Sequence, residues 1–279
     1  MDKKPKSVAK ETKEPPHSGA PRSGTQSIER VVSMLRIVAS RGQGGMRIGE
    51  IATTSGLPQS TCFRMLHRLE AEGLVTRAEH TRKYYLGPLL YELGLLAKPR
   101  YRLSELCEGS LEQLAEVTQD TIYLSERSGL EAVCTYRAIG DYPIKSLALD
   151  VGIRRPLGVG AGGLAILCAL PPDEAEAIVQ ANEFKYEKYG FVTAPFLREA
   201  IKAGREKGYA CLDSVATPGT AAIGIAFPPE NPIAAISVAA ISGRLESHRR
   251  EEVARLMRPR IRAICETMNQ RNSLGETSP

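Results

Sequence analysis

The sequence predicts an α+β protein with a helical N-terminal part and a mixed C-terminal part. Three observations predict this class. Apolar residues recur at helical spacing through residues 27–73, where glycines interrupt them. Residues 74–86 read as two short strands around a polar tip. Beyond residue 101, a hairpin, several helices and then short apolar strands follow one another, without the regular strand–helix alternation of a parallel sheet.

Composition and charge limit the kinds of protein that this chain can be. The 279 residues carry a net charge of +5, which mildly favours polyanionic partners. No stretch is long and apolar enough to cross a bilayer, and the basic segment 1–26 lacks the apolar core of a secretory signal. The six cysteines include no C-x-x-C pair, and the four histidines show no metal-ligand spacing. We expect a cytoplasmic protein with no metal and no membrane partner, a disordered tail over 1–26 and a flexible tail over 273–279.

Two helices open the folded part. An apolar stripe from Ile28 to Val38 predicts the first, with Ser27 as its N-cap. The segment 46–55 predicts a short second helix that Gly56 ends, with Ile51 facing inward.

A third helix follows a tight turn. Pro58 suits its first turn, and Cys62, Leu66 and Leu69 form its inner stripe. The opposite face is polar and basic, as in the second helix of a helix-turn-helix. The residues expected to enter the DNA major groove are Gln59, Ser60, Thr61, Arg64 and Arg68. Arg64 is the first choice for a bidentate contact with guanine.

The two strands near 74–78 and 83–86 form a wing beside this helix. Arg82, Lys83 and Tyr84 are expected to hold DNA phosphates there. Any one of these elements fits a small helical domain with a solvated basic face. Their order predicts a winged helix-turn-helix over 27–87 that binds double-stranded DNA.

The segment 88–100 reads as a linker helix. Four leucines, Leu89, Leu90, Leu93 and Leu96, are too many for an isolated surface helix. We interpret it as packing on a partner subunit in a homodimer or homotetramer. The alternative is that it packs on its own domain.

Residues 101–272 form the C-terminal domain. A hairpin is expected around Ser128 and Gly129. The remaining predicted elements are helices near 102–119, 162–170, 173–182, 196–207 and 246–270, and strands near 144–151, 209–213, 221–228 and 234–241.

Three glycines in this domain, Gly158, Gly160 and Gly163, fit the G-x-G-x-x-G spacing of a dinucleotide-binding turn. That turn needs a buried strand before it, and Arg154, Arg155 and Pro156 do not suit a central strand. We therefore expect no dinucleotide and no other cofactor. Small residues at a helix N-terminus still suit a small carboxylate.

Several segments together resemble the IclR family of bacterial transcriptional regulators. They are SIERVVSMLRIVAS (27–40), IGEIATTSGLPQSTCFRMLHRLEAEGLV (48–75), YYLGPLLYELG (84–94), VGIRRPLGVGAGGLAIL (151–167), REKGYACLD (205–213) and PGTAAIGIAFP (218–228). The resemblance covers roughly 27–270. It implies an N-terminal winged helix-turn-helix, a C-terminal GAF-like α/β domain that binds an effector, and dimers or dimers of dimers on palindromic operator DNA.

By this resemblance, the glycine loop lines an effector pocket. The residues carried over to the pocket are Gly160, Ala161, Gly162, Asp213, Ala222 and Ser237. The chain departs from the family where polar residues are common, with Ala221 and Ala222 on one strand and no acidic residue in 214–217. We expect a small organic-acid effector that is larger or more apolar than a simple oxoacid, such as an aromatic or alicyclic acid or a thioester.

Two other functions stay open on the residues alone. An enzyme would use Cys211 or Cys168 as nucleophile, but no histidine falls in the expected pocket segments, so we expect no catalytic residue. A constitutive DNA-binding regulator with a vestigial sensor would have the same sequence pattern. Activation and repression are equally compatible with it.

Overall fold

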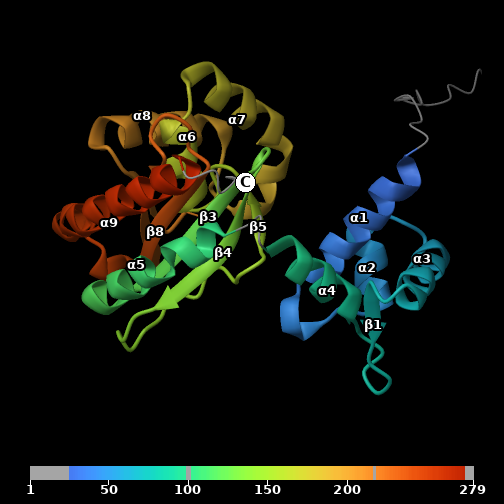
Figure 1. The fold of residues 1–279 in the computed structure, drawn as a ribbon. Helices are drawn as coiled ribbons and strands as arrows, with labels where there is room; N and C mark the ends of the chain where they lie inside the picture. The colour runs from blue at the N-terminus through green and yellow to red at the C-terminus, as the bar shows by residue number, and fades with distance from the viewer. Residues whose placement is uncertain (1–24, 99–101, 216–217, 274–279) are drawn as a thin grey trace, which may run out of the picture. The chain divides into compact units, whose positions relative to one another are not determined.

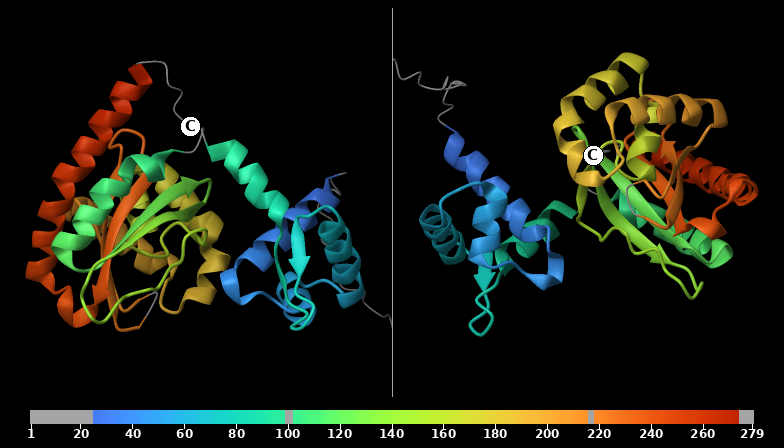
Figure 2. Two further views of the ribbon diagram at one scale, coloured as in Figure 1. Left: turned by 60° about the horizontal axis from the view of Figure 1, so that its bottom comes forward. Right: turned by 180° about the vertical axis from the view of Figure 1, so that it is seen from behind.

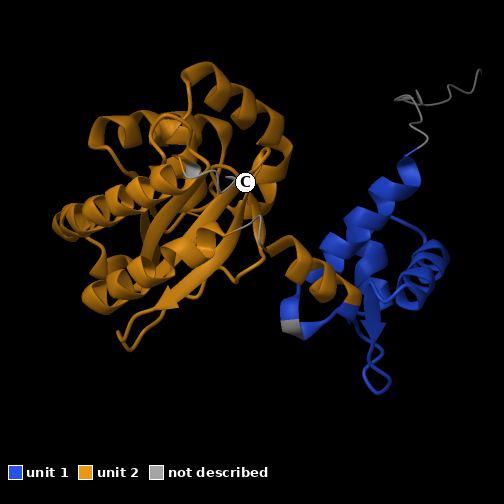
Figure 3. Ribbon diagram, in the orientation of Figure 1, with its two compact units in different colours: residues 1–88 blue, residues 89–279 orange. Residues whose placement is uncertain are grey.

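The structure is a computed structural model that describes residues 25–98, 102–215 and 218–273. The chain folds into two compact units, 1–88 and 89–279 (Figure 3). The tails expected at both ends lie almost entirely outside the described residues. Among the described helices, none combines the length and apolar character that a membrane crossing requires.

The N-terminal unit is a small helical domain with a two-stranded ribbon (Figure 1). Its elements are α1 (Gln26–Ala39), η1 (Gly42–Gly44), α2 (Ile48–Ser55), α3 (Gln59–Ala71), β1 (Val75–Arg77) and β2 (Tyr84–Leu86). The apolar stripes of the three helices meet in one core, as their spacing predicts. The core includes Met34, Val38, Ile51, Cys62, Leu66 and Leu69.

The first helix differs from expectation in its start and its buried face. Thr25, not Ser27, precedes it as N-cap residue. Ile28 is 62% exposed and Val32 is also exposed, whereas Met34 is buried. The helix projects beyond the core at its N-terminal end, so only its second half is covered.

The turn between α2 and α3 is short. Gly56 takes a left-handed conformation with φ of 65° at the end of α2, which lets the chain reverse. Pro58 is the N-cap residue of α3. In the ribbon, Val75 pairs with Leu86 and Arg77 with Tyr84 in antiparallel register. This arrangement confirms the winged helix-turn-helix predicted for this part of the chain.

The C-terminal unit is a six-stranded antiparallel sheet between two layers of helices (Figures 1 and 2). Its helices are α4 (Pro88–Ala97), α5 (Leu103–Thr118), α6 (Ala161–Ala169), α7 (Pro172–Tyr186), η3 (Glu187–Tyr189), α8 (Ala194–Lys207), η4 (Ser242–Arg244) and α9 (Ser247–Ser273). Its strands are β3 (Thr121–Ser128), β4 (Glu131–Ile139), β5 (Arg154–Pro156), β6 (Ala210–Asp213), β7 (Thr220–Phe227) and β8 (Ala234–Ile241).

The strand order is β5-β4-β3-β8-β7-β6. Successive residues of a strand point to opposite faces. On β3, Ile122 and Leu124 face the core under α5 and α9, whereas Tyr123 and Ser125 face the other layer, where α6 lies. The antiparallel sheet confirms the α+β class. All pairings among the described strands of this sheet are antiparallel, and β5, which precedes the glycine loop, is a three-residue edge strand, so the loop does not stand in the parallel strand–helix–strand unit that a dinucleotide turn needs.

One predicted strand is wrong. Residues 144–151 form no strand, although their apolar side chains alternate. They belong to a segment, 140–153, that we call the strap. Its middle carbonyl oxygens accept hydrogen bonds from side chains of the sheet: Tyr123 Oη donates to Ser146 O at 2.6 Å and Arg137 donates to Leu149 O at 3.1 Å. The alternating apolar residues of 144–151 therefore belong to a segment that lies over the sheet and not to a strand that pairs within it.

Candidate functional site

Helix α3 presents a polar, basic face to solvent. The side chains of Gln59, Ser60, Arg64 and Arg68 are exposed, and Thr61 is half-buried. Cys62, Leu66 and Leu69 hold the opposite face in the core. The structure thus leaves four of the five predicted groove residues exposed, and the fifth half-buried, on a helix whose position is fixed by packing.

The two arginines of this face differ in their partners. Arg68 forms an exposed ion pair with Glu72, one turn further along α3. Arg64 has no ion pair or hydrogen bond within the described residues. Its guanidinium is therefore available for bidentate contact with a base edge.

The wing carries two of its three predicted phosphate ligands at the surface. Arg82 is exposed and takes a left-handed conformation, with φ of 55°. Lys83 Nζ donates to the carbonyl oxygen of Gly44 at 2.8 Å, which ties the wing to the turn after α1. An ammonium has three donors, so Lys83 retains two for a phosphate.

The prediction for Tyr84 is wrong. Its side chain is 2% exposed and belongs to the core of the N-terminal unit, where the Arg77 guanidinium lies 5.5 Å from its ring centre. Burial raises the pKa of its hydroxyl. In a three-residue strand one face must pack on the helices, and here that face carries Tyr84.

Sequence reasoning missed an aromatic pair on α3. Phe63 is 50% exposed, and its ring stacks on His67 with 6.2 Å between ring centres. Phe63 lies outside the apolar stripe of α3, which Cys62, Leu66 and Leu69 form. An aromatic residue off the stripe of a basic helix was the signal that could have revealed it.

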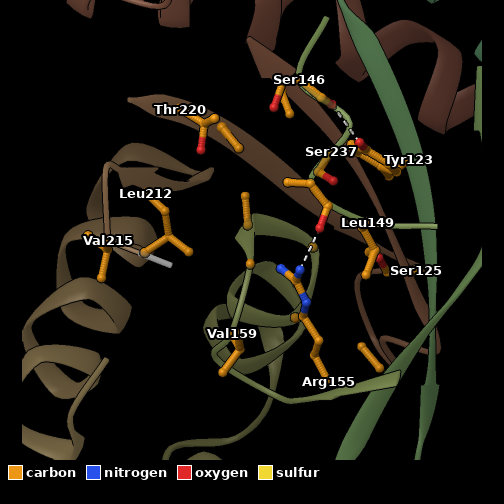
Figure 4. A pocket seen from close by; sticks show the side chains of 18 residues that line it. Tyr123, Ser125, Ser146, Leu149, Arg155, Val159, Leu212, Val215, Thr220 and Ser237 are labelled. Atoms are coloured by element: carbon orange, nitrogen blue, oxygen red, sulfur yellow. Dashed lines mark hydrogen bonds between the residues drawn. The ribbon is translucent and has the colours of Figure 1, made fainter. Parts of the chain in front are cut away.

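The C-terminal unit contains a cavity between the sheet, the start of α6 and the strap (Figure 4). The space between these walls is about 680 Å³, a volume that includes open solvent at its mouth. Five of the six predicted pocket residues line it: Gly160, Ala161, Gly162, Ala222 and Ser237. Sequence reasoning missed Tyr123, Ser125, Ser146, Leu149, Arg155 and Thr220, which also line it.

The glycine loop brings the start of α6 against the sheet. Gly160 precedes the helix with φ of 89°, a conformation that other residues rarely adopt. A side-chain carbon at Gly162 would lie 2.8 Å from Ser125 Oγ and 3.0 Å from its Cβ, so only glycine fits there without displacement. The backbone amides at the start of α6 lack intrahelical acceptors and give this wall of the cavity a positive dipole end.

Hydroxyl groups lie on the sheet side of the same cavity. Ser125 and Ser237 are each 5% exposed, and neither hydroxyl has a hydrogen-bond partner within the described part of the chain. Ser146 Oγ of the strap is buried and likewise has no partner there. Buried polar groups are normally satisfied, so three unpaired hydroxyls in one cavity indicate a polar ligand group.

The prediction for Asp213 is wrong. Leu212 lines the cavity, and its neighbour Asp213 therefore points away from it along β6. The Asp213 carboxylate pairs with Arg250 at 2.5 Å. Hydrogen bonds from Ser242 and from Arg250 lower its pKa, and Asp213 thus belongs to the outer surface of the sheet edge.

The cysteines considered as nucleophiles are poorly suited to that role. Burial raises the pKa of Cys168 to about 12 and also raises that of Cys211. Thiolates, and not thiols, are the reactive species. Within the described ranges, no three His, Cys, Asp or Glu side chains gather as a metal site.

Helix α4 is apolar yet uncovered. None of its residues is buried, and Leu96 is 80% exposed, with Tyr91, Leu93 and Leu95 also at the surface. Exposed apolar groups of this density are typical of a protein interface.

Two family models match the chain. Residues 27–79 match the IclR helix-turn-helix domain, and residues 99–266 match the C-terminal domain of the bacterial transcriptional regulator IclR. Together they span both units of the structure. The second model alone covers more than half of the chain.

The chain is also similar in sequence to known transcriptional regulators. The chain is 30% identical to the HTH-type transcriptional regulator KipR of Bacillus subtilis (strain 168), across 73% of this chain and 82% of that protein. It is 26% identical to the HTH-type transcriptional repressor AllR of Escherichia coli (strain K12), across 86% and 89%.

A solved structure has the same fold. It is an IclR homolog complexed with 4-hydroxybenzoate from Microbacterium hydrocarbonoxydans, with a TM-score of 0.62, 21% identity and coverage of 85% of this chain and 99% of that one. The relatives above are named as regulators and not as enzymes, in line with the sequence prediction. On these matches, the chain belongs to the IclR family of bacterial transcriptional regulators.

Proposed function

We propose that this protein binds operator DNA through α3 and the wing, and that a small organic acid in the cavity of the C-terminal unit changes that binding. The observation that carries the proposal is the cavity itself. It combines the N-terminus of a helix, three unpaired hydroxyls and many apolar lining side chains. Such a site fits an acidic group on an apolar body.

On the DNA side, Arg64 reads a guanine in the major groove, with Gln59, Ser60 and Thr61 beside it. The exposed Phe63 ring suits the methyl group of a thymine. Arg82 and Lys83 hold phosphates of the flanking backbone. Arg68 pairs with Glu72 at the surface, and an exposed pair of this kind is weak, so Arg68 can leave Glu72 for the DNA.

On the ligand side, the carboxylate lies near the start of α6 and accepts hydrogen bonds from Ser125 and Ser237. The alanines at 222 and 239 and the side chains of Leu149 and Leu212 surround the rest of the molecule. This lining favours an aromatic or alicyclic acid over a simple oxoacid. The structure of a homolog complexed with 4-hydroxybenzoate supports that choice.

The proposed active form is a homodimer or a dimer of dimers. The exposed leucines of α4 support it, because a helix of this composition is rarely left in water. Two copies would place two α3 helices on the half-sites of a palindromic operator.

The test is a mobility-shift assay of the full chain on the DNA upstream of its own gene, at physiological salt and with competitor DNA. It is run with and without benzoate, 4-hydroxybenzoate and cyclohexanecarboxylate. We expect a specific shift that at least one acid strengthens or weakens. A specific shift that no acid changes would refute the effector proposal, and loss of the shift to any competitor would refute specific operator binding.

A further inference from the structure

The cavity contains a charged side chain that the sequence did not reveal. Among the described lining residues, Arg155 is the only one that is ionised at neutral pH. It lies on the edge strand β5, opposite Ala132 of β4, and reaches in among the lining side chains (Figure 4).

The guanidinium of Arg155 is unpaired within the part of the chain that the structure describes. It forms no ion pair within the described residues, whereas its neighbour Arg154 pairs with Glu131 at 2.9 Å. One of its nitrogens donates to the carbonyl oxygen of Ala148 at 2.5 Å. A guanidinium has five N–H donors, so it can bind a carboxylate in bidentate geometry and keep this bond.

The bond to Ala148 links the cavity to the strap. The carbonyl oxygens of Ser146, Ala148 and Leu149 accept hydrogen bonds from side chains of three different strands, Tyr123, Arg155 and Arg137. Of these three donors, Tyr123 and Arg155 also line the cavity. A ligand that fixes the Arg155 guanidinium would therefore fix the middle of the strap.

We propose that Arg155 is the specificity-determining residue of the effector site: it selects acids over neutral analogues and transmits occupancy to the strap. The ligand class is a carboxylic acid with an apolar body. Its carboxylate pairs with the Arg155 guanidinium and also accepts hydrogen bonds from Ser125 and Ser237, while the Ala148 bond persists. The inference rests on the proposed function, since it assumes that this cavity holds the effector. The reason is that a partly desolvated cation without a counter-ion costs free energy, and a bound anion removes that cost.

The chain offers a matched control. Arg154 and Arg155 are adjacent on β5 and point to opposite sides, so only Arg155 lines the cavity. Replacing either by methionine removes one guanidinium from the same three-residue strand. A general effect on the sheet edge would appear in both variants, whereas loss of acid selection would appear only in Arg155→Met.

The experiment measures binding by titration calorimetry with the full chain and three acid–amide pairs. These are benzoate and benzamide, 4-hydroxybenzoate and 4-hydroxybenzamide, and cyclohexanecarboxylate and its carboxamide. We expect the wild type and Arg154→Met to prefer the best acid over its amide by roughly tenfold to a hundredfold. Arg155→Met should lose most of this preference, and Arg155→Lys, which keeps the charge, should retain part of it.

Hydrogen exchange of peptides from 140–153 gives a second measurement. A saturating acid should slow exchange there in the wild type and in Arg154→Met, and not in Arg155→Met. If Arg155→Met fails to fold, the Arg155→Lys comparison decides, because full wild-type preference and protection in that variant would contradict a bidentate contact.

The outcomes separate this inference from the proposed function. If acids bind and Arg155→Met keeps the full preference over amides, Arg155 is not the selecting residue, but the effector proposal stands. If none of the acids binds, the effector proposal fails and this inference fails with it. Specific DNA binding is judged independently by the mobility shift.

Discussion

The close approach of α6 to the sheet gives a sharp prediction for Gly224→Ala. Gly224 lies in the middle of β7, opposite Ser237 of β8. A side-chain carbon at this position would lie 2.8 Å from the carbonyl carbon of Ala161, nearer still to its oxygen, and 3.2 Å from the Ala165 side chain. The obstructing atoms at Ala161 belong to backbone, so no rotamer change relieves the clash.

The magnitude follows from these distances. Carbon atoms in contact are normally about 3.5–4.0 Å apart, so α6 must move outward by roughly 0.7–1.2 Å. Overpacking of this kind costs about 1–3 kcal/mol of unfolding free energy, and we expect the upper part of that range because backbone must move. The reduced chain entropy of the unfolded alanine variant offsets only about 0.4–1 kcal/mol.

Equilibrium unfolding in urea, followed by far-ultraviolet circular dichroism, measures the effect. Gly109→Ala is the matched control: Gly109 lies on the exposed side of α5, and its added carbon would meet no atom within 4 Å. The same chemical change should there raise stability by about 0.5–1 kcal/mol, because alanine favours the helix. Equal stability of the two variants would refute the direct packing of α6 on β7 and, with it, the position of the cavity wall.

Three further predictions concern the DNA-binding unit and acid stability. Arg64→Ala should reduce the preference for operator over random DNA by about 1–3 kcal/mol. Lys83→Ala should weaken binding to operator and to random DNA equally, and should lower by about one the slope of log affinity against log salt concentration. Titrations of the two DNAs at several salt concentrations distinguish these effects. Tyr84→Ala should lower the unfolding free energy by about 3–5 kcal/mol, since the ring is buried. Tyr84→Phe should leave DNA affinity unchanged at every salt concentration. If the Tyr84 hydroxyl did contact a phosphate, the phenylalanine variant would bind DNA more weakly than the wild type. Hydrogen bonds from Arg198 and Gln180 lower the pKa of Glu176 to about 2 from an unperturbed 4.5, so its stabilisation is present above pH 4.5 and is lost as the pH falls towards 2. Glu176→Gln should therefore flatten the stability curve in that interval, and an unchanged acid-unfolding curve would contradict the assignment.

The N-terminal unit was largely predictable because helix periodicity is local. Cys62, Leu66 and Leu69 recur on one side of a helix whatever surrounds it, and the polar side follows by exclusion. The wing was predicted as an element, but the burial of Tyr84 was not. In a three-residue strand, the sequence does not indicate which face meets the helices.

The cavity was predictable only in part. The glycine loop was found because Gly160 and Gly162 carry a local backbone requirement. Asp213 was placed in the pocket although Leu212 occupies that position. A shift of one residue along a strand moves a side chain to the opposite face, and strand spacing in the sequence does not fix that choice.

The sequence by itself determined the order of the elements, the basic face of α3, the small residues of the α6 loop and the family resemblance. All of these depend on residues near one another in the chain. The tertiary structure decided the pairing of Tyr123 with the distant Ser237, which sets Ser125 and Ser237 in one cavity. It also turned Arg155 inward and made 140–153 a strap. Such groupings depend on the register of distant strands, which long-range packing selects and local patterns do not encode.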